Sequence, residues 1–178
     1  MRQFLLGCFV VCWAVFGIAA EKTPPVVDAR AVLEKDGVYP GMTAHMAVVA
    51  KITSGYHIND HKPSHDYLIP TVLKMESNPQ VLVQDIDYPR GKLIKFEFDD
   101  AKLSVYEGTV GVKAELKIAS GAEAGNYTLK GKFAYQACNE HACFPPTSVP
   151  VELAVKVVPA GTRLKHVNED IFKRAKVE

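Results

Sequence analysis

The nine residues VGVKAELKI, at positions 110–118, alternate apolar and charged side chains with a period of two. Apolar side chains occupy the even positions, and Lys113, Glu115 and Lys117 lie between them. Successive side chains of a β-strand point to opposite faces, so this segment predicts a strand with one buried and one solvated face. Such a strand is typical of an antiparallel sheet that has one wet side.

Similar segments recur along the chain, and Gly- and Pro-containing turn signals separate them. They are VVDARAVLE, TAHMAVVAKIT, IPTVLKM, VLVQDIDY, KLIKFEF, NYTLKGKFAYQA and VPVELAVKVV. Seven to nine short strands with almost no helical periodicity predict an all-β fold, an immunoglobulin-like antiparallel β-sandwich. The exception is NEDIFKRAK near the C-terminus, which predicts a short helical tail.

The first twenty residues, MRQFLLGCFVVCWAVFGIAA, carry one positive charge, then an apolar run, then small residues. That layout predicts a signal peptide over residues 1–20, cleaved after Ala20. An uncleaved membrane anchor is the main alternative, although the run is barely long enough to span a bilayer. We expect an exported protein with one domain over residues 21–160 and a tail over 161–178.

Charge composition excludes some partners. Removal of residues 1–20 takes away Arg2 and no acidic residue, which leaves 20 basic and 20 acidic residues and no net charge. Nothing in this balance favours a nucleic acid or an anionic surface as partner. No other segment is apolar enough for a membrane span after signal cleavage. No Ser/His/Asp triad, recognisable carboxylate pair or phosphate-binding glycine loop is present.

Two cysteines remain after the predicted cleavage, Cys138 and Cys143 in YQACNEHACFPP, at positions 135–146. A pair of cysteines in an oxidising compartment predicts a disulfide. If the chain turns back at NEHA, the two residues face each other across a hairpin. Facing Cα atoms are then roughly 4.5–5.5 Å apart, a separation that a disulfide tolerates.

Such a disulfide is a weak staple. A cross-link that closes about six residues stabilises a fold by only roughly 2 kcal/mol. Tyr127, Leu129, Phe133 and Tyr135 share the parity expected of the core side, so Cys138 is expected on the opposite, polar face. A surface disulfide is open to attack by a partner's thiolate. From the residues alone, a redox-active and a static disulfide both remain open.

Neighbouring side chains offer further candidates. His141, if protonated, would favour a nearby thiolate, or it is an ordinary loop histidine. Tyr56 and His57 are expected to pack beside the cysteine hairpin, or to serve as plain core or loop residues.

Metal binding is a third possibility. His57, His61 and His65 are spaced at four, but Pro63 makes a helix there improbable. A copper or zinc site would need these histidines to meet the cysteine hairpin in space. We favour scattered histidines, and expect no metal and no cofactor.

The string YQACNEHACFPP, followed by VPVELAV, resembles the N-terminal periplasmic domain of thiol:disulfide interchange protein DsbD, the disulfide bond corrector family. GYHIND at 55–60, Lys62-Pro63 and YLIPT at 67–71 strengthen the resemblance, which covers roughly residues 25–158. The chain departs from the best-known members by having one residue fewer between its cysteines.

The resemblance implies an immunoglobulin-like domain whose cysteine pair takes electrons from one thioredoxin-like protein and passes them to others, including those of cytochrome c biogenesis. In this family Cys143 would form the mixed disulfides and Cys138 would resolve them. The family also shields its cysteines with a cap loop bearing an aromatic residue, and Phe98 in FEFDDAKLSVY is the candidate here.

The expected function is therefore a periplasmic thiol–disulfide exchange module, a component of a protein-disulfide reductase. Its expected partners are thioredoxin-like periplasmic proteins. The sequence holds neither a multi-helix membrane domain nor a CxxC domain, so a membrane electron donor is expected on another chain. The alternatives are a non-catalytic immunoglobulin-like binding or scaffold module with a structural disulfide and, less favoured, a copper- or zinc-binding protein.

Overall fold

The computed structural model of the chain describes residues 25–76 and 78–173. The predicted signal peptide lies outside the described residues. Within them, no helix is both long enough and apolar enough to cross a membrane.

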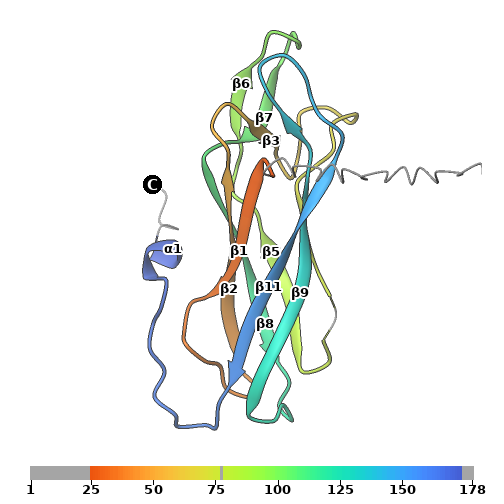
Figure 1. Cartoon of the computed structure of the whole chain (residues 1–178). Coiled ribbons are helices and arrows are strands. Elements are labelled where there is room, and N and C mark those ends of the chain that lie inside the picture. Colours follow the sequence, from red (N-terminus) through yellow and green to blue (C-terminus); the bar gives the residue numbers. More distant parts are fainter. Residues whose placement is uncertain (1–24, 77, 174–178) are drawn as a thin grey trace, which may run out of the picture.

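Over the described residues, eleven strands form three antiparallel sheets, followed by one short helix (Figure 1). The first sheet has the order β1 (Val27–Leu33), β2 (Thr43–Ile52), β8 (Thr109–Ile118), β5 (Val81–Asp87). The second has the order β11 (Thr147–Val157), β9 (Gly125–Tyr135), β4 (Val72–Met75). The third has the order β10 (Ala137–Cys138), β3 (His57–Asn59), β7 (Lys102–Tyr106), β6 (Lys92–Lys95), and the helix is α1 (Glu169–Lys173).

The predicted immunoglobulin-like β-sandwich and the short C-terminal helix are therefore confirmed. The segment at 110–118 lies in β8, a central strand of the first sheet, and its even-numbered side chains are buried. These side chains join a core cluster shared with the inward residues of β9 and β11. The period of two thus identified the face of β8 that packs between the sheets.

The third sheet lies at one end of the sandwich, where Figure 1 shows β3, β6 and β7 together. Both of its faces are covered at β10, β3 and most of β7, whereas β6 is largely exposed. On β7, Tyr106 belongs to the main core, whereas the adjacent Val105 belongs to a second, small cluster. That small cluster comprises Leu68, Phe96, Leu103 and Val105, with Ile94 packed against it.

A buried carboxylate fixes this end of the molecule. Asp60 directly follows β3 and is 8% exposed. Its oxygens accept hydrogen bonds from the hydroxyls of Tyr106 (2.6 Å) and Ser104 (2.7 Å). The backbone N–H groups of Gly91 (3.0 Å) and Lys62 (3.2 Å) complete the set. Burial alone would raise the pKa of Asp60, but these hydrogen bonds outweigh it and lower that pKa below its ordinary value.

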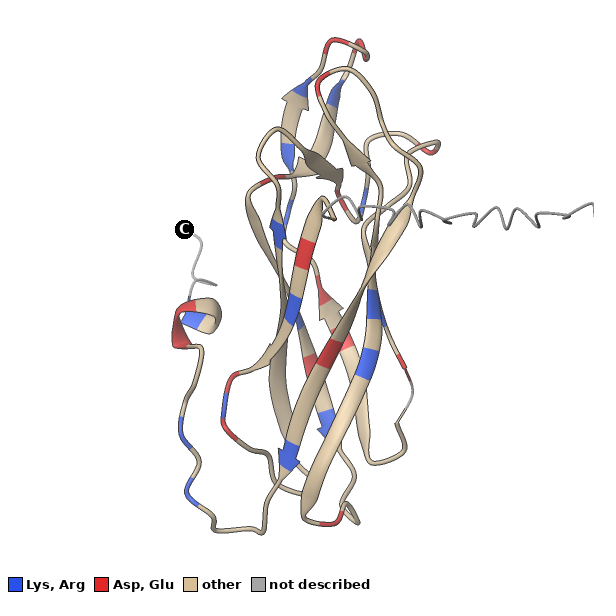
Figure 2. Ribbon diagram, in the orientation of Figure 1, with Lys and Arg blue, Asp and Glu red and all other residues tan. Residues whose placement is uncertain are grey.

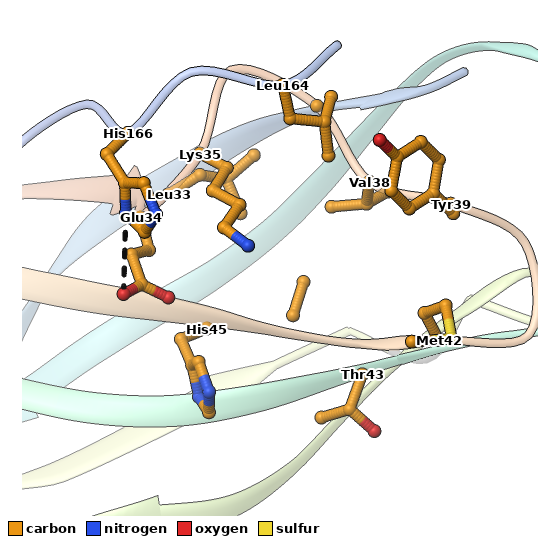
Figure 3. A pocket seen from close by; sticks show the side chains of 12 residues that line it. Leu33, Glu34, Lys35, Val38, Tyr39, Met42, Thr43, His45, Leu164 and His166 are labelled. Atoms are coloured by element: carbon orange, nitrogen blue, oxygen red, sulfur yellow. Dashed lines mark ion pairs between the residues drawn. The ribbon is translucent and has the colours of Figure 1, made fainter. Parts of the chain in front are cut away.

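The tail after β11 runs back alongside the first sheet (Figure 1). The Val167 N–H donates to the Glu34 carbonyl (2.8 Å), and the His166 ring lies 3.8 Å from the Glu34 carboxylate. Figure 3 shows this ion pair beside the pocket that the tail forms with the end of β1 and the start of β2. The tail is therefore tied to the domain through Glu34.

Acidic and basic side chains are mixed on the strands of the first sheet, whereas the strands of the second and third sheets carry mostly lysines, some of which pair with acidic side chains (Figure 2). Lys130 on β9, for example, lies 4.0 Å from Glu152 on β11.

Candidate functional site

Cys138 and Cys143 are joined by a disulfide across a tight hairpin. The two residues form an antiparallel bridge with Cα atoms 3.9 Å apart, closer than the sequence suggested. The Asn139 N–H donates to the Ala142 carbonyl (2.9 Å), and the Phe144 N–H donates to the Ala137 carbonyl (2.8 Å). The predicted hairpin, with its turn at NEHA, is confirmed.

The side chain of Asn139 holds the turn. Its Oδ1 accepts hydrogen bonds from the backbone N–H groups of His141 and Ala142, both at 2.9 Å. Asparagine commonly closes turns in this way, because its short side chain reaches backbone donors two or three residues on. The turn is thus specified by the residue immediately after the first cysteine.

The two cysteines differ in exposure. Cys138 is 0% exposed, whereas Cys143 is only partly buried. The expectation that Cys138 lies on an exposed polar face is wrong. The prediction that Cys138 points away from the main core is correct, because the neighbouring Ala137 points into that core. Cys138 is buried nevertheless, because the small second cluster lies on the opposite face of the third sheet.

His57 and Phe96 lie on the covered face. His57 on β3 is the register partner of Cys138 on β10, so the two side chains share a face. The imidazole is 5% exposed and stacks on Phe96, with ring centroids 4.0 Å apart. Phe98 stacks in turn on Phe96 at 5.4 Å and is 38% exposed. The prediction that His57 packs beside the hairpin is borne out by this register.

The buried imidazole is not fully satisfied. Among the described residues, His57 Nε2 has no hydrogen-bond partner. Burial lowers the pKa of His57, and the carboxylate of Glu107 only partly opposes that shift. The imidazole is therefore held towards its neutral form.

Residues 96–101, here named the cap segment, connect β6 to β7 and carry both phenylalanines. Asp99 fastens this segment to the loop between β3 and β4 by accepting a hydrogen bond from the Tyr67 hydroxyl (2.7 Å). His141 of the cysteine hairpin lies near it, with its Nδ1 3.9 Å from the carboxylate of Glu97. His141 thus faces the cap segment, and both members of this ion pair are largely exposed.

Gln136 ties the hairpin to the rest of the site. Its Oε1 accepts hydrogen bonds from Asn59 Nδ2 and from the Ile69 N–H, both at 3.0 Å. Its Nε2 donates to the Phe144 carbonyl at 3.2 Å. Sequence reasoning gave no role to Gln136, although it lies two residues before Cys138.

Exposed apolar side chains surround the hairpin. Phe144, directly after Cys143, is 40% exposed and lies 5.9 Å from the Tyr56 ring. Ile69 and Phe98 are also exposed. Exposed apolar side chains that gather in one patch are characteristic of surfaces that bind other proteins.

The histidines of the proposed metal site are dispersed. His61 stacks on Tyr88 at 3.7 Å, and His65 stacks on Tyr67 at 5.1 Å. Across residues 25–76 and 78–173, no group of three or more His, Cys, Asp or Glu side chains is placed to hold a metal ion.

These features define an immunoglobulin-like domain with a short-range cystine at one end. Residues 28–154 match the family described as thiol:disulfide interchange protein DsbD, N-terminal. The chain belongs to this family, as its motifs predicted.

Solved structures share the fold. The N-terminal periplasmic domain of ScsB from Proteus mirabilis is 16% identical, with a TM-score of 0.50, over 73% of this chain and 47% of that chain. The chain thus spans about half the length of that structure.

A complex between the DsbD N-terminal and PilB N-terminal domains from Neisseria meningitidis contains a chain that is 19% identical. That match has a TM-score of 0.38 and covers 78% of this chain and 88% of that one. A comparison with curated proteins finds no match.

Proposed function

We propose that this chain is a periplasmic thiol–disulfide exchange module that passes reducing equivalents between thioredoxin-like proteins through Cys138 and Cys143. The unequal exposure of the two sulfurs carries this proposal. Cys143 is partly exposed and borders Phe144, whereas Cys138 is fully buried. A docked protein therefore has access to one sulfur, and the other is kept for the intramolecular step.

The exchange is a pair of thiolate substitutions. A thiolate of a partner dithiol attacks Cys143 Sγ, which forms a mixed disulfide and releases Cys138 as a thiolate. The partner's second thiol then attacks the partner sulfur that is bonded to Cys143, which closes the partner's disulfide and releases Cys143. The partner ends as a disulfide, and its two electrons and two protons end on Cys138 and Cys143. The same steps in reverse reduce the next protein.

The surroundings of the hairpin suit transient docking. Phe144, Ile69 and Phe98 supply exposed apolar area, and His141 and Glu97 supply charge at its edge. In Neisseria meningitidis a DsbD N-terminal domain forms a complex with a PilB N-terminal domain, which supports a protein partner for the present chain. The periplasmic ScsB domain and the signal-peptide pattern support a periplasmic location. The proposed electron donor is a membrane protein supplied by another chain.

The test is a redox titration of the mature protein against glutathione, combined with trapping by a thioredoxin-like protein. We expect a reduction potential above about −300 mV, because structural disulfides have potentials below that value. The Cys138→Ala variant is expected to accumulate a mixed disulfide through Cys143, and the matched Cys143→Ala variant to accumulate little, because Cys138 is buried. A potential far below that range, with no trapped species in either variant, would assign the domain to the alternative, a scaffold with a structural disulfide.

A further inference from the structure

Cys138 raises a chemical problem that the disulfide itself does not solve. In the proposed exchange Cys138 leaves as a thiolate, and it does so at a position that is 0% exposed. Burial in apolar surroundings destabilises a thiolate and raises the pKa of the thiol. A slow leaving group would follow, unless a polar group lies within reach of the sulfur.

His57 is placed to be that group. It is the antiparallel register partner of Cys138, and side chains in such pairs have Cβ atoms roughly 4.5–5.5 Å apart on the same face. Its ring is oriented by stacking on Phe96 and is almost fully buried. Few buried imidazole nitrogens lack a hydrogen bond, yet His57 Nε2 has none among the described residues of the disulfide form.

We propose that His57 is the positioning residue for the Cys138 sulfur, and that its Nε2 finds its hydrogen-bond partner only when the disulfide opens. This inference rests on the proposed function. In a disulfide the sulfur has no S–H to donate and accepts hydrogen bonds poorly. Once Cys143 has formed the mixed disulfide, Cys138 Sγ is released with its electron pair beside the imidazole.

The imidazole serves both forms of the released sulfur. In one tautomer the imidazole N–H donates a hydrogen bond to the thiolate and stabilises it. In the other tautomer the same ring nitrogen accepts a hydrogen bond from the S–H of the thiol. The thiolate takes up one of the two protons that the partner dithiol gives up. His57 therefore stabilises the reduced protein and leaves the oxidised protein with an unsatisfied nitrogen. The imidazole shifts the equilibrium of the pair towards reduction.

The measurement is the thiol–disulfide equilibrium constant of the mature protein with glutathione, for the wild type and for His57→Phe. Phenylalanine keeps a ring to stack on Phe96 but removes the nitrogens. We expect the equilibrium to shift about tenfold towards the disulfide, the effect of about one buried hydrogen bond. For a two-electron couple that shift corresponds to about 30 mV.

Two further variants separate a chemical role from packing. His57→Gln keeps a hydrogen-bonding side chain and is expected to restore part of the shift. His61→Phe is the matched control, because His61 also stacks on an aromatic ring but has no register pairing with Cys138. It is expected to leave the equilibrium unchanged. In Cys143→Ala, thiolate absorbance should place the pKa of Cys138 lower with His57 than with phenylalanine, because the hydrogen bond from the imidazole N–H to the charged sulfur is stronger than the one from the neutral S–H to the ring nitrogen.

The inference fails if wild type and His57→Phe have the same equilibrium constant and the same Cys138 pKa. A purely structural histidine would give that result, because its loss would change both redox forms alike. Failure of the proposed function has another signature: a wild-type potential far below −300 mV and no trapped partner, whatever residue 57 is.

Discussion

Replacing Asp60 by Asn should loosen the end of the sandwich that holds the cysteine hairpin. Tyr106 and Lys62 donate to Oδ1, and Ser104 and Gly91 donate to Oδ2. The asparagine amide has one oxygen and one NH₂ group. In either orientation the NH₂ group therefore faces one hydroxyl and one backbone N–H, which are both donors and can no longer be accepted. The two hydroxyls can rotate away, but a backbone N–H cannot.

The magnitude follows from these contacts. One buried backbone N–H loses its acceptor, and the hydroxyl hydrogen bonds to a charged oxygen become neutral ones, for a total cost of about 3 kcal/mol. With a urea m-value of about 2 kcal/mol/M, the midpoint falls by about 1.5 M. Thermal unfolding is expected about 10 °C lower.

The assay is urea unfolding of the mature protein at neutral pH, with Asp66→Asn as the matched control because Asp66 is exposed. Acidification adds a second test. The lowered pKa of Asp60 means that its contribution is complete above the unfolded-state value of about 3.9 and is lost as the pH falls through the folded-state value. The stability gap between wild type and Asp60→Asn should therefore narrow below pH 4. Equal midpoints for the two variants, or a gap that widens in acid, would refute this reasoning.

Three further results are expected. Gly131→Ala should lower the unfolding free energy by about 2 kcal/mol or more, since its Cβ would lie 2.6 Å from the Lys74 carbonyl oxygen; urea unfolding would show this, and no change would contradict it. Gln136→Ala should speed amide hydrogen exchange by about tenfold in the residues that directly follow the hairpin, because it removes the side chain that joins the hairpin to the β3 region. In the reduced protein, iodoacetamide should modify Cys143 at least about tenfold faster than Cys138, as peptide mass spectrometry would report; equal rates would deny the difference in accessibility.

Local patterns predicted the strands and the hairpin well. The alternation in VGVKAELKI depends only on one strand and its two faces, so the local sequence is enough to predict the strand and its buried side. The turn at NEHA is also local, since the Asn139 side chain reaches only the next few residues.

Long-range contacts account for what sequence reasoning missed. Parity placed Cys138 opposite the main core, and the structure agrees, but parity says nothing of what packs on that side. Phe96, distant in the sequence, covers the face and stacks on His57, whereas the expected Phe98 lies one ring further out. Gln136 likewise has partners near residues 59 and 69 that no local period reveals.

The hairpin's own hydrogen bonds have a consequence for repeated use. Two backbone bonds and the two accepted by Asn139 join residues 137–144, and none of them involves a sulfur atom. Opening the disulfide therefore leaves the loop folded, with the separated thiols still adjacent. Ring closure then needs no conformational search, and in the proposed exchange each turnover returns the chain to its starting shape.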